Sequence, residues 1–142
     1  MNGILIDASV VASWLLEDET SVIAQKVFVE LRSGVPAFAP SLWLLEVTTL
    51  LFNAERRKRI DRRQRDDAFE RVSRLPITIL NAPTFSDLPI LRLYAEKYQL
   101  TAYDAEYLRV AKEQKLILAT LDGNLLAAAK REKIAVAAPD FH

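Results

Sequence analysis

The chain has 142 residues, of which 51% are hydrophobic and 27% charged, and its mean hydropathy is +0.06. These values are typical of a globular sequence and predict a single domain over residues 1–142. The absence of cysteine excludes disulfides, thiol catalysis and zinc sites built on thiolates. Because the N-terminus has no basic region and no apolar stretch approaches the roughly 18 residues of a membrane span, we expect a cytoplasmic protein.

The net charge is zero, but positive charge is concentrated in residues 56–65. This stretch has seven basic residues and one acidic residue, which leaves 12 basic and 18 acidic residues in the rest of the chain. An acidic body with one basic stripe is typical of a protein that holds a polyanion at one place and gathers cations at another. The alternative is a solvated helix face. The candidates for RNA contacts in this basic stripe are Arg56, Arg57, Arg59, Arg62, Arg63 and Arg65.

Short apolar runs alternate with helical stretches along the chain. In chain order we expect a strand at 3–8, helices at 9–17 and from 21 to about 33, a strand at 36–40, and helices at 41–59 and 61–74. A strand at 76–80, helices at 86–98 and 102–114, a strand at 116–120, a helix at 124–133 and an edge strand at 134–137 follow. Ser41 and Asp61 are the expected starts of their helices. This alternation predicts a three-layer α/β/α domain with a central parallel sheet of four or five strands.

Two acidic residues lie where a ligand is expected. In open α/β sheets, ligands bind beyond the carboxyl ends of the strands. Asp7 ends the first apolar run, and Asp122 lies just past the run at 116–120. Each also fits a structural role, because an Asp that caps a helix stabilises it by about 0.5–2 kcal/mol. Both interpretations stay open for each residue.

Glu46 is the only charged residue between Leu42 and Phe52. On a helix its neighbours four residues away are Leu42 and Leu50, so its carboxylate lies along an apolar stripe. Burying an unpaired carboxylate is costly, so Glu46 must reach water, a cationic partner or a metal ion. The alternative is a glutamate that extends to solvent at the rim of the sheet.

Asp104 lies in the sequence Thr101-Ala-Tyr-Asp104, which matches a capping box with Thr101 as the N-cap. It also begins a helix with an apolar face, formed by Tyr107, Leu108 and Ala111, just before the strand that leads to Asp122. The four acids therefore point to one edge of the sheet, and clustered carboxylates without histidine suit Mg²⁺ or Mn²⁺.

Other chemistries are disfavoured by the residues present. The single histidine, His142, is the last residue, so a Ser–His–Asp triad is excluded. There is no glycine-rich phosphate loop. An aspartyl-nucleophile phosphatase needs a second acid two residues after Asp7, where Ser9 stands.

Over nearly its whole length the chain resembles the PIN-domain nucleases, and among them the VapC toxins of type II (VapBC) toxin–antitoxin pairs. The segments that carry the resemblance are Ile-Leu-Ile-Asp7-Ala-Ser9, Pro40-Ser-Leu-Trp-Leu-Leu-Glu46-Val, Leu100-Thr-Ala-Tyr-Asp104-Ala-Glu-Tyr-Leu and Leu118-Ala-Thr120-Leu-Asp122-Gly-Asn-Leu. It implies a PIN-like fold and a Mg²⁺- or Mn²⁺-dependent endoribonuclease. The implied catalytic and metal-binding residues are Asp7, Glu46, Asp104 and Asp122.

The resemblance also implies accessory groups and partners. Ser9 and Thr120 would be accessory hydroxyls, and Asn124 would offer an amide in place of the Asn that many relatives have where this chain has Thr49. Implied partners are an RNA substrate such as tRNA or rRNA, a cognate VapB-like antitoxin that blocks the groove, and a second copy in a homodimer. Apolar residues of the early helices are compatible with a dimer surface: Val22, Val27, Leu31, Leu42, Trp43 and Phe52.

Two other functions remain open for such a chain. One is a non-catalytic PIN-like binding module, which would need no four acids at one edge. The other is a DNA-directed nuclease, since no residue in the sequence reports on the 2′-hydroxyl group of RNA.

Overall fold

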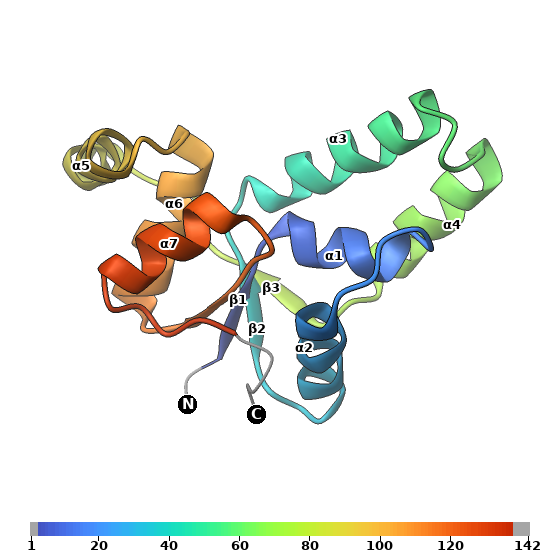
Figure 1. Ribbon diagram of the computed structural model, residues 1–142, viewed down its shortest axis with the longest axis horizontal. Helices are drawn as coiled ribbons and strands as arrows, with labels where there is room; N and C mark the ends of the chain where they lie inside the picture. Colours follow the sequence, from blue (N-terminus) through green and yellow to red (C-terminus); the bar gives the residue numbers. More distant parts are fainter. Residues whose placement is uncertain (1–2, 138–142) are drawn as a thin grey trace.

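Helices lie on both sides of a central sheet in the computed structural model, which describes residues 3–137 (Figure 1). The elements are β1 (Ile4–Ile6), α1 (Ala8–Leu15), α2 (Val22–Arg32), β2 (Ala37–Ala39), α3 (Trp43–Arg56), α4 (Arg62–Ser73), β3 (Ile77–Ile79), the 3-10 helix η1 (Phe85–Asp87), α5 (Leu88–Tyr98), α6 (Ala102–Gln114), β4 (Ile117–Ala119) and α7 (Gly123–Arg131). The predicted α/β class with a parallel sheet is confirmed. His142 lies outside the described residues.

The four strands run parallel in the order β3-β2-β1-β4. Ile4 is in register with Ala37 of β2 and with Ile117 of β4, so β1 has a partner on each side. Its three residues are fully buried because both of its faces are covered as well. The carboxyl ends of β1 and β4 therefore lie side by side.

Side chains along β1 point alternately to the two faces of the sheet, and each face has its own hydrophobic core. Ile4 and Ile6 belong to the core formed with α1, α2, α3 and α4. Leu5 points to the other face, where it joins the core formed with α5, α6 and α7. In Figure 1 these two groups of helices lie on opposite sides of the strands, which confirms the three-layer arrangement.

Two local predictions are wrong. The long helix does not begin at Ser41: it begins at Trp43, and a backbone turn from Trp43 N–H to Pro40 C=O (3.0 Å) takes the place of a side-chain cap. Residues 134–137 form an isolated parallel bridge between Leu118 and Val136 rather than a regular strand. By contrast, Asp61 caps α4 as expected, in a reciprocal box with Gln64.

The early helices leave less unpartnered apolar surface than their sequence suggests. Val27, Leu31 and Trp43 are buried in the core, whereas Val22 is 61% exposed. Half of the six predicted side chains thus belong to the core that forms where α1, α2, α3 and α4 pack together. Within the described residues, none of the helices combines the length and the hydropathy that a membrane span requires.

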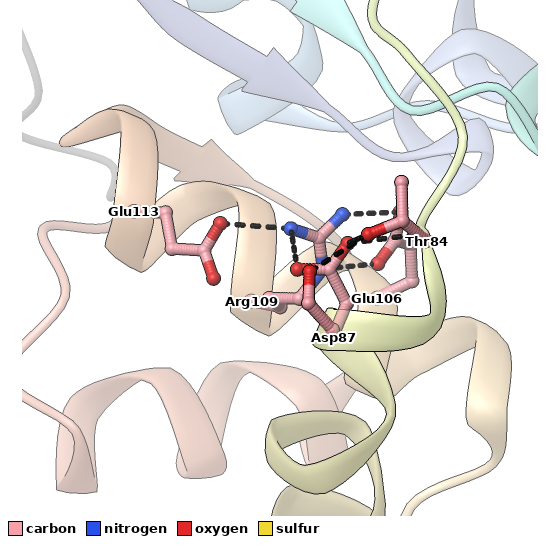
Figure 2. A network of polar contacts seen from close by, with 6 residues as sticks. Thr84, Asp87, Glu106, Arg109 and Glu113 are labelled. Atoms are coloured by element: carbon pink, nitrogen blue, oxygen red, sulfur yellow. Dashed lines mark hydrogen bonds and ion pairs between the residues drawn. The ribbon is translucent and has the colours of Figure 1, made fainter.

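A buried ion-pair network holds α6 against η1 (Figure 2). The Arg109 guanidinium donates to both carboxylate oxygens of Glu106, at 2.7 and 2.9 Å. It also contacts Glu113 at 2.8 Å and Asp87 at 3.4 Å. Glu106 and Glu113 lie on α6 with Arg109, so it is the contact with Asp87 that links α6 to η1. Arg109 and Glu106 are 7% and 2% exposed, so this cluster is largely shielded from solvent.

Candidate functional site

Asp7 follows β1 and is held by two hydroxyl groups. Its carboxylate Oδ2 accepts hydrogen bonds from Ser9 Oγ at 2.8 Å and from Thr120 Oγ1 at 2.6 Å. The Asp7 side chain forms no cap on α1, so the capping interpretation is wrong for this residue. Burial raises the pKa of Asp7, the two hydroxyl donors oppose that rise, and the negative charge of Asp122 adds to it.

The same two hydroxyls join the ends of β1 and β4. Ser9 Oγ accepts from the backbone N–H of Leu121 at 3.0 Å, and Thr120 Oγ1 accepts from that of Asp122 at 3.0 Å. Each hydroxyl therefore donates to Asp7 and accepts from the loop after β4. Ser9 and Thr120 thus position a carboxylate and also hold the loop that carries Asp122.

Asp122 caps α7, as the capping interpretation predicted. Its Oδ1 accepts from the backbone N–H groups of Asn124 at 2.9 Å and Leu125 at 3.2 Å. Asn124 lines a separate hollow with Lys97, Tyr98 and Arg131. The structure therefore places Asp122 at the edge of the sheet where the other acids lie. Asn124 contacts an acid there through its backbone N–H, which donates to Asp122.

Glu46 lies in the first turn of α3 and faces α6. Its Oε1 accepts a hydrogen bond of 2.6 Å from the hydroxyl of Tyr107. Burial raises the pKa of Glu46 to about 7, the Tyr107 bond opposes this rise, and the charges of Asp7 and Asp104 add to it. The partner of Glu46 is therefore a neutral phenol from another helix, which was not among the water, cation or metal ion that the sequence argument required.

Asp104 lies in the first turn of α6, where its backbone N–H donates to Thr101 Oγ1 at 3.1 Å. The Thr101 half of the predicted capping box is thus present. Burial raises the pKa of Asp104 to about 6, and the negative charges of Asp122 and Asp7 contribute. The Asp104 carboxylate is electrostatically coupled to acids that follow two different strands.

All four predicted acids line one cavity of about 600 Å³ at the carboxyl ends of β1 and β4. Its lining residues are Asp7, Ala8, Ser9, Leu42, Leu45, Glu46, Thr49, Leu50, Tyr103, Asp104 and Asp122. Among the described residues that line it, four are acidic and none is basic. Thr49, which departs from the family pattern, lies on the cavity wall.

The donor set of this cavity suits a hard divalent cation, because carboxylate oxygens are the ligands that Mg²⁺ and Mn²⁺ prefer. Within residues 3–137, however, no three Asp, Glu or His side chains are close enough together to form a ready-made metal site. Burial is the main cause of the raised pKa values of Glu46 and Asp104, and repulsion from the neighbouring carboxylates adds to it. A cation would have to draw the carboxylates together.

Sequence reasoning missed Tyr107. It treated Tyr107 as part of the apolar face of its helix, and the residue is indeed fully buried. The available signal was its spacing, because a residue three positions after Asp104 lies on the same side of a helix.

The basic stripe lies where α3 turns into α4, about ten residues or roughly 15 Å along α3 from Glu46. Two of its arginines are already engaged. Arg59 pairs with Asp18 and Glu19, both at 2.7 Å. Arg65 pairs with Glu55 at 2.7 Å. Arg57, Arg62 and Arg63 are exposed and form no ion pair within the described part of the chain.

Comparison with known proteins gives one family and several structural likenesses. Residues 4–132 match the PIN domain family. PAE2754 from Pyrobaculum aerophilum is 24% identical, with a TM-score of 0.66 over 94% of this chain and 82% of that chain. FitAcB from Neisseria gonorrhoeae is 20% identical, with a TM-score of 0.65 over 96% and 97% of the two chains.

A structure of FitAB bound to the IR36 DNA fragment is also 20% identical, with a TM-score of 0.64 over 98% of this chain and 96% of that chain. At these identities the likeness to solved structures concerns the fold. No curated protein matches the chain.

Proposed function

The chain belongs to the PIN domain family, and from this premise we propose that it is a metal-dependent endoribonuclease. The observation that carries the proposal is the cavity of about 600 Å³ that four carboxylates line without a basic side chain among the described residues. A scaffold or binding module has no need of four mutually repelling acids at one edge of its sheet. The proposed catalytic and metal-binding residues are Asp7, Glu46, Asp104 and Asp122.

Bound Mg²⁺ or Mn²⁺ would lower the pKa of a coordinated water and offset negative charge on the phosphodiester. In this proposal Asp7 and Asp104 are direct ligands, and Glu46 and Asp122 act directly or through water. Ser9 and Thr120 hold the Asp7 carboxylate in place through their hydrogen bonds of 2.8 and 2.6 Å. A residue with this supporting role is expected to affect metal affinity without being a ligand itself.

The proposed substrate is RNA, such as tRNA or rRNA, with its backbone held in part by the exposed arginines of the basic stripe. An acidic cavity repels a polyanion, so a separate cationic surface supports binding. The stripe lies roughly 15 Å along α3 from Glu46, which is within the reach of a short stretch of RNA.

We propose further that the protein is a cytoplasmic toxin that an antitoxin inhibits by covering the cavity. Support comes from exposed apolar side chains at its rim, where Leu45 is 73% exposed and Tyr103 is 62% exposed. Exposed apolar groups around a polar cleft are typical of a surface that a partner covers. A homodimer stays part of this proposal as well.

Cleavage of matched RNA and single-stranded DNA by the purified protein, freed of any partner, tests the activity. We expect RNA to be cut in Mn²⁺ or Mg²⁺ and to stay intact in EDTA, with little competition from DNA. Preferential cleavage of DNA would replace the ribonuclease with a DNA-directed nuclease. No cleavage of either polymer by the folded protein in Mn²⁺ would support the binding module instead.

A further inference from the structure

Tyr107 connects the second hydrophobic core to the acidic cavity. Its ring is fully buried in α6 among the residues of that core. Its hydroxyl extends out of this apolar core and donates a hydrogen bond to Glu46 Oε1 at the edge of the sheet. The two residues are 61 positions apart in the sequence. Burial and the nearby charges of Asp7 and Glu46 raise the pKa of Tyr107, so its hydroxyl keeps its proton and remains a donor.

The position of this hydroxyl is determined by the packing of α6. Leu108 and Ala105 beside it are fully buried. On the side of α6 that faces η1, the buried Arg109 pairs with Asp87 of η1 at 3.4 Å, as Figure 2 shows. Because the helix is held from both sides, Tyr107 offers its proton at a fixed place. Glu46, by contrast, has three rotatable bonds and lies in a half-exposed turn of α3.

We propose that Tyr107 is a positioning residue of the metal site and acts through Glu46. Its hydroxyl donates a hydrogen bond to Oε1 of the Glu46 carboxylate, so Oε2 is left to bind a cation in the cavity. This inference rests on the proposed metal-dependent function. Without the bond, Glu46 must be ordered when the cation binds, and the entropy of that ordering weakens binding.

A purely structural role for the bond makes a different prediction. The hydroxyl would then only satisfy a half-buried carboxylate, so its removal would change the melting temperature and leave cation binding unchanged. Cation affinity and its dependence on Glu46 therefore separate the two roles.

The test is calorimetric titration of the full chain with Mn²⁺, without RNA, on Tyr107→Phe, Glu46→Gln and the double variant. Tyr107→Phe keeps the ring and removes only the hydroxyl. We expect it to weaken Mn²⁺ affinity about tenfold, as loss of a residue that orients a ligand usually does. In the Glu46→Gln background, Tyr107→Phe should produce no further loss, because its effect passes through that carboxylate.

Tyr94→Phe is the matched control. Tyr94 is also a buried tyrosine whose hydroxyl donates to a glutamate, Glu132, at 3.4 Å. That pair lies outside the acidic cavity, so this variant should bind Mn²⁺ as the parent protein does.

The outcomes separate the inference from the function on which it rests. If Glu46→Gln weakens Mn²⁺ binding and Tyr107→Phe does not, the positioning role is overturned while the metal site stands. If the parent protein shows no saturable binding, both are overturned. Should Tyr107→Phe fail to fold, Tyr107→Leu provides the second variant, because it also removes the hydroxyl, keeps an apolar side chain in the core and leaves Glu46 unchanged. A similar loss of affinity supports the role, and unchanged affinity contradicts it.

Discussion

Thr120 and Asp7 are 113 positions apart in the sequence, yet Thr120 Oγ1 donates a hydrogen bond of 2.6 Å to Asp7 Oδ2. The bond crosses between the ends of β4 and β1, which are neighbours in the sheet. Ser9 donates to the same oxygen at 2.8 Å. Two hydroxyl donors thus support a carboxylate that burial disfavours, which is the arrangement expected of an acid retained for function rather than for stability.

Asp7→Asn should stabilise the metal-free protein and abolish its activity. Burial raises the pKa of Asp7, so its charged form disfavours folding at pH 8, and a neutral amide of the same shape removes this cost. We expect a higher melting temperature in EDTA and a loss of RNA cleavage of about 100-fold or more in Mn²⁺. Asp67→Asn, at an exposed acid of α4, is the control. A lower melting temperature for Asp7→Asn than for the parent would contradict this account.

The metal-free protein should lose stability as the pH rises from about 4.5 to about 7. The pKa of Asp104 is raised to about 6 and that of Glu46 to about 7, so the folded state holds protons in this range that the unfolded state has released. A state that holds more protons is favoured at low pH, so the free energy of unfolding falls as these groups ionise and levels off about one pH unit above the pKa of Glu46. Urea unfolding in EDTA at several pH values measures this.

Glu46→Gln tests whether the Glu46 carboxyl is one of the groups that cause this loss of stability as the pH rises. It removes one of the titrating carboxyls, so the fall in stability between pH 5 and pH 7 should be smaller than in the parent. A parent protein whose stability rises over this range would show that folding does not raise the pKa values of Glu46 and Asp104.

Much of the site was predictable because topology alone determines where strands end. Asp7 and Asp122 follow two strands of apolar sequence, and parallel strands place their carboxyl ends at one edge. The choice between ligand and helix cap was not predictable. Both residues occupy N-cap positions, but only Asp122 forms the cap, because the Ser9 and Thr120 hydroxyls bond the Asp7 carboxylate.

The remaining features depend on contacts between distant residues. Tyr107 has the pattern of a core residue in the sequence, and only the packing of α6 near α3 brings its hydroxyl to Glu46. Arg59 belongs to a basic run, but it pairs with Asp18, 41 residues away. Ser41 has the sequence of a helix cap, and the turn after Pro40 moves the helix start to Trp43. The order of residue types along the chain does not show which distant residues will come into contact.

Arg109→Ala should be one of the most destabilising substitutions in the chain. Glu106 is 2% exposed and has its two oxygens bonded to Arg109 at 2.7 and 2.9 Å. Removing Arg109 leaves a buried carboxylate without its partner, which costs about 3–5 kcal/mol. Urea unfolding measures the loss. Glu106→Gln combined with Arg109→Met should recover a large part of it, whereas a double variant no more stable than Arg109→Ala would argue against an unpaired charge as the cause.

The free arginines of the basic stripe should contribute to RNA binding without contributing to stability. Arg57, Arg62 and Arg63 are exposed, and no ion pair holds them within the described residues. Replacing all three with Gln should weaken RNA binding and reduce the slope of log affinity against log salt by about 2, because each phosphate that a cation neutralises on a single strand contributes roughly 0.7 to that slope. Binding is measured in EDTA, which prevents cleavage.

The control for the stripe replaces three exposed basic residues elsewhere, namely Arg92, Lys115 and Lys133. It removes the same charge, so it should change the salt slope less than the stripe variant does. Equal effects of the two triple variants would mean that the net charge, and not the stripe, determines RNA binding.

A calorimetric titration of the protein with Mn²⁺ at pH 6.5 tests whether the four carboxylates form one cation site. Because burial and mutual repulsion raise the pKa values of Asp104 and Glu46 to about 6 and about 7, cation binding should displace protons. We predict saturable binding whose heat depends on the ionisation enthalpy of the buffer, and loss of that binding in Asp104→Asn but not in Asp67→Asn. No saturable binding, or equal binding by Asp104→Asn and the parent protein, would contradict the account.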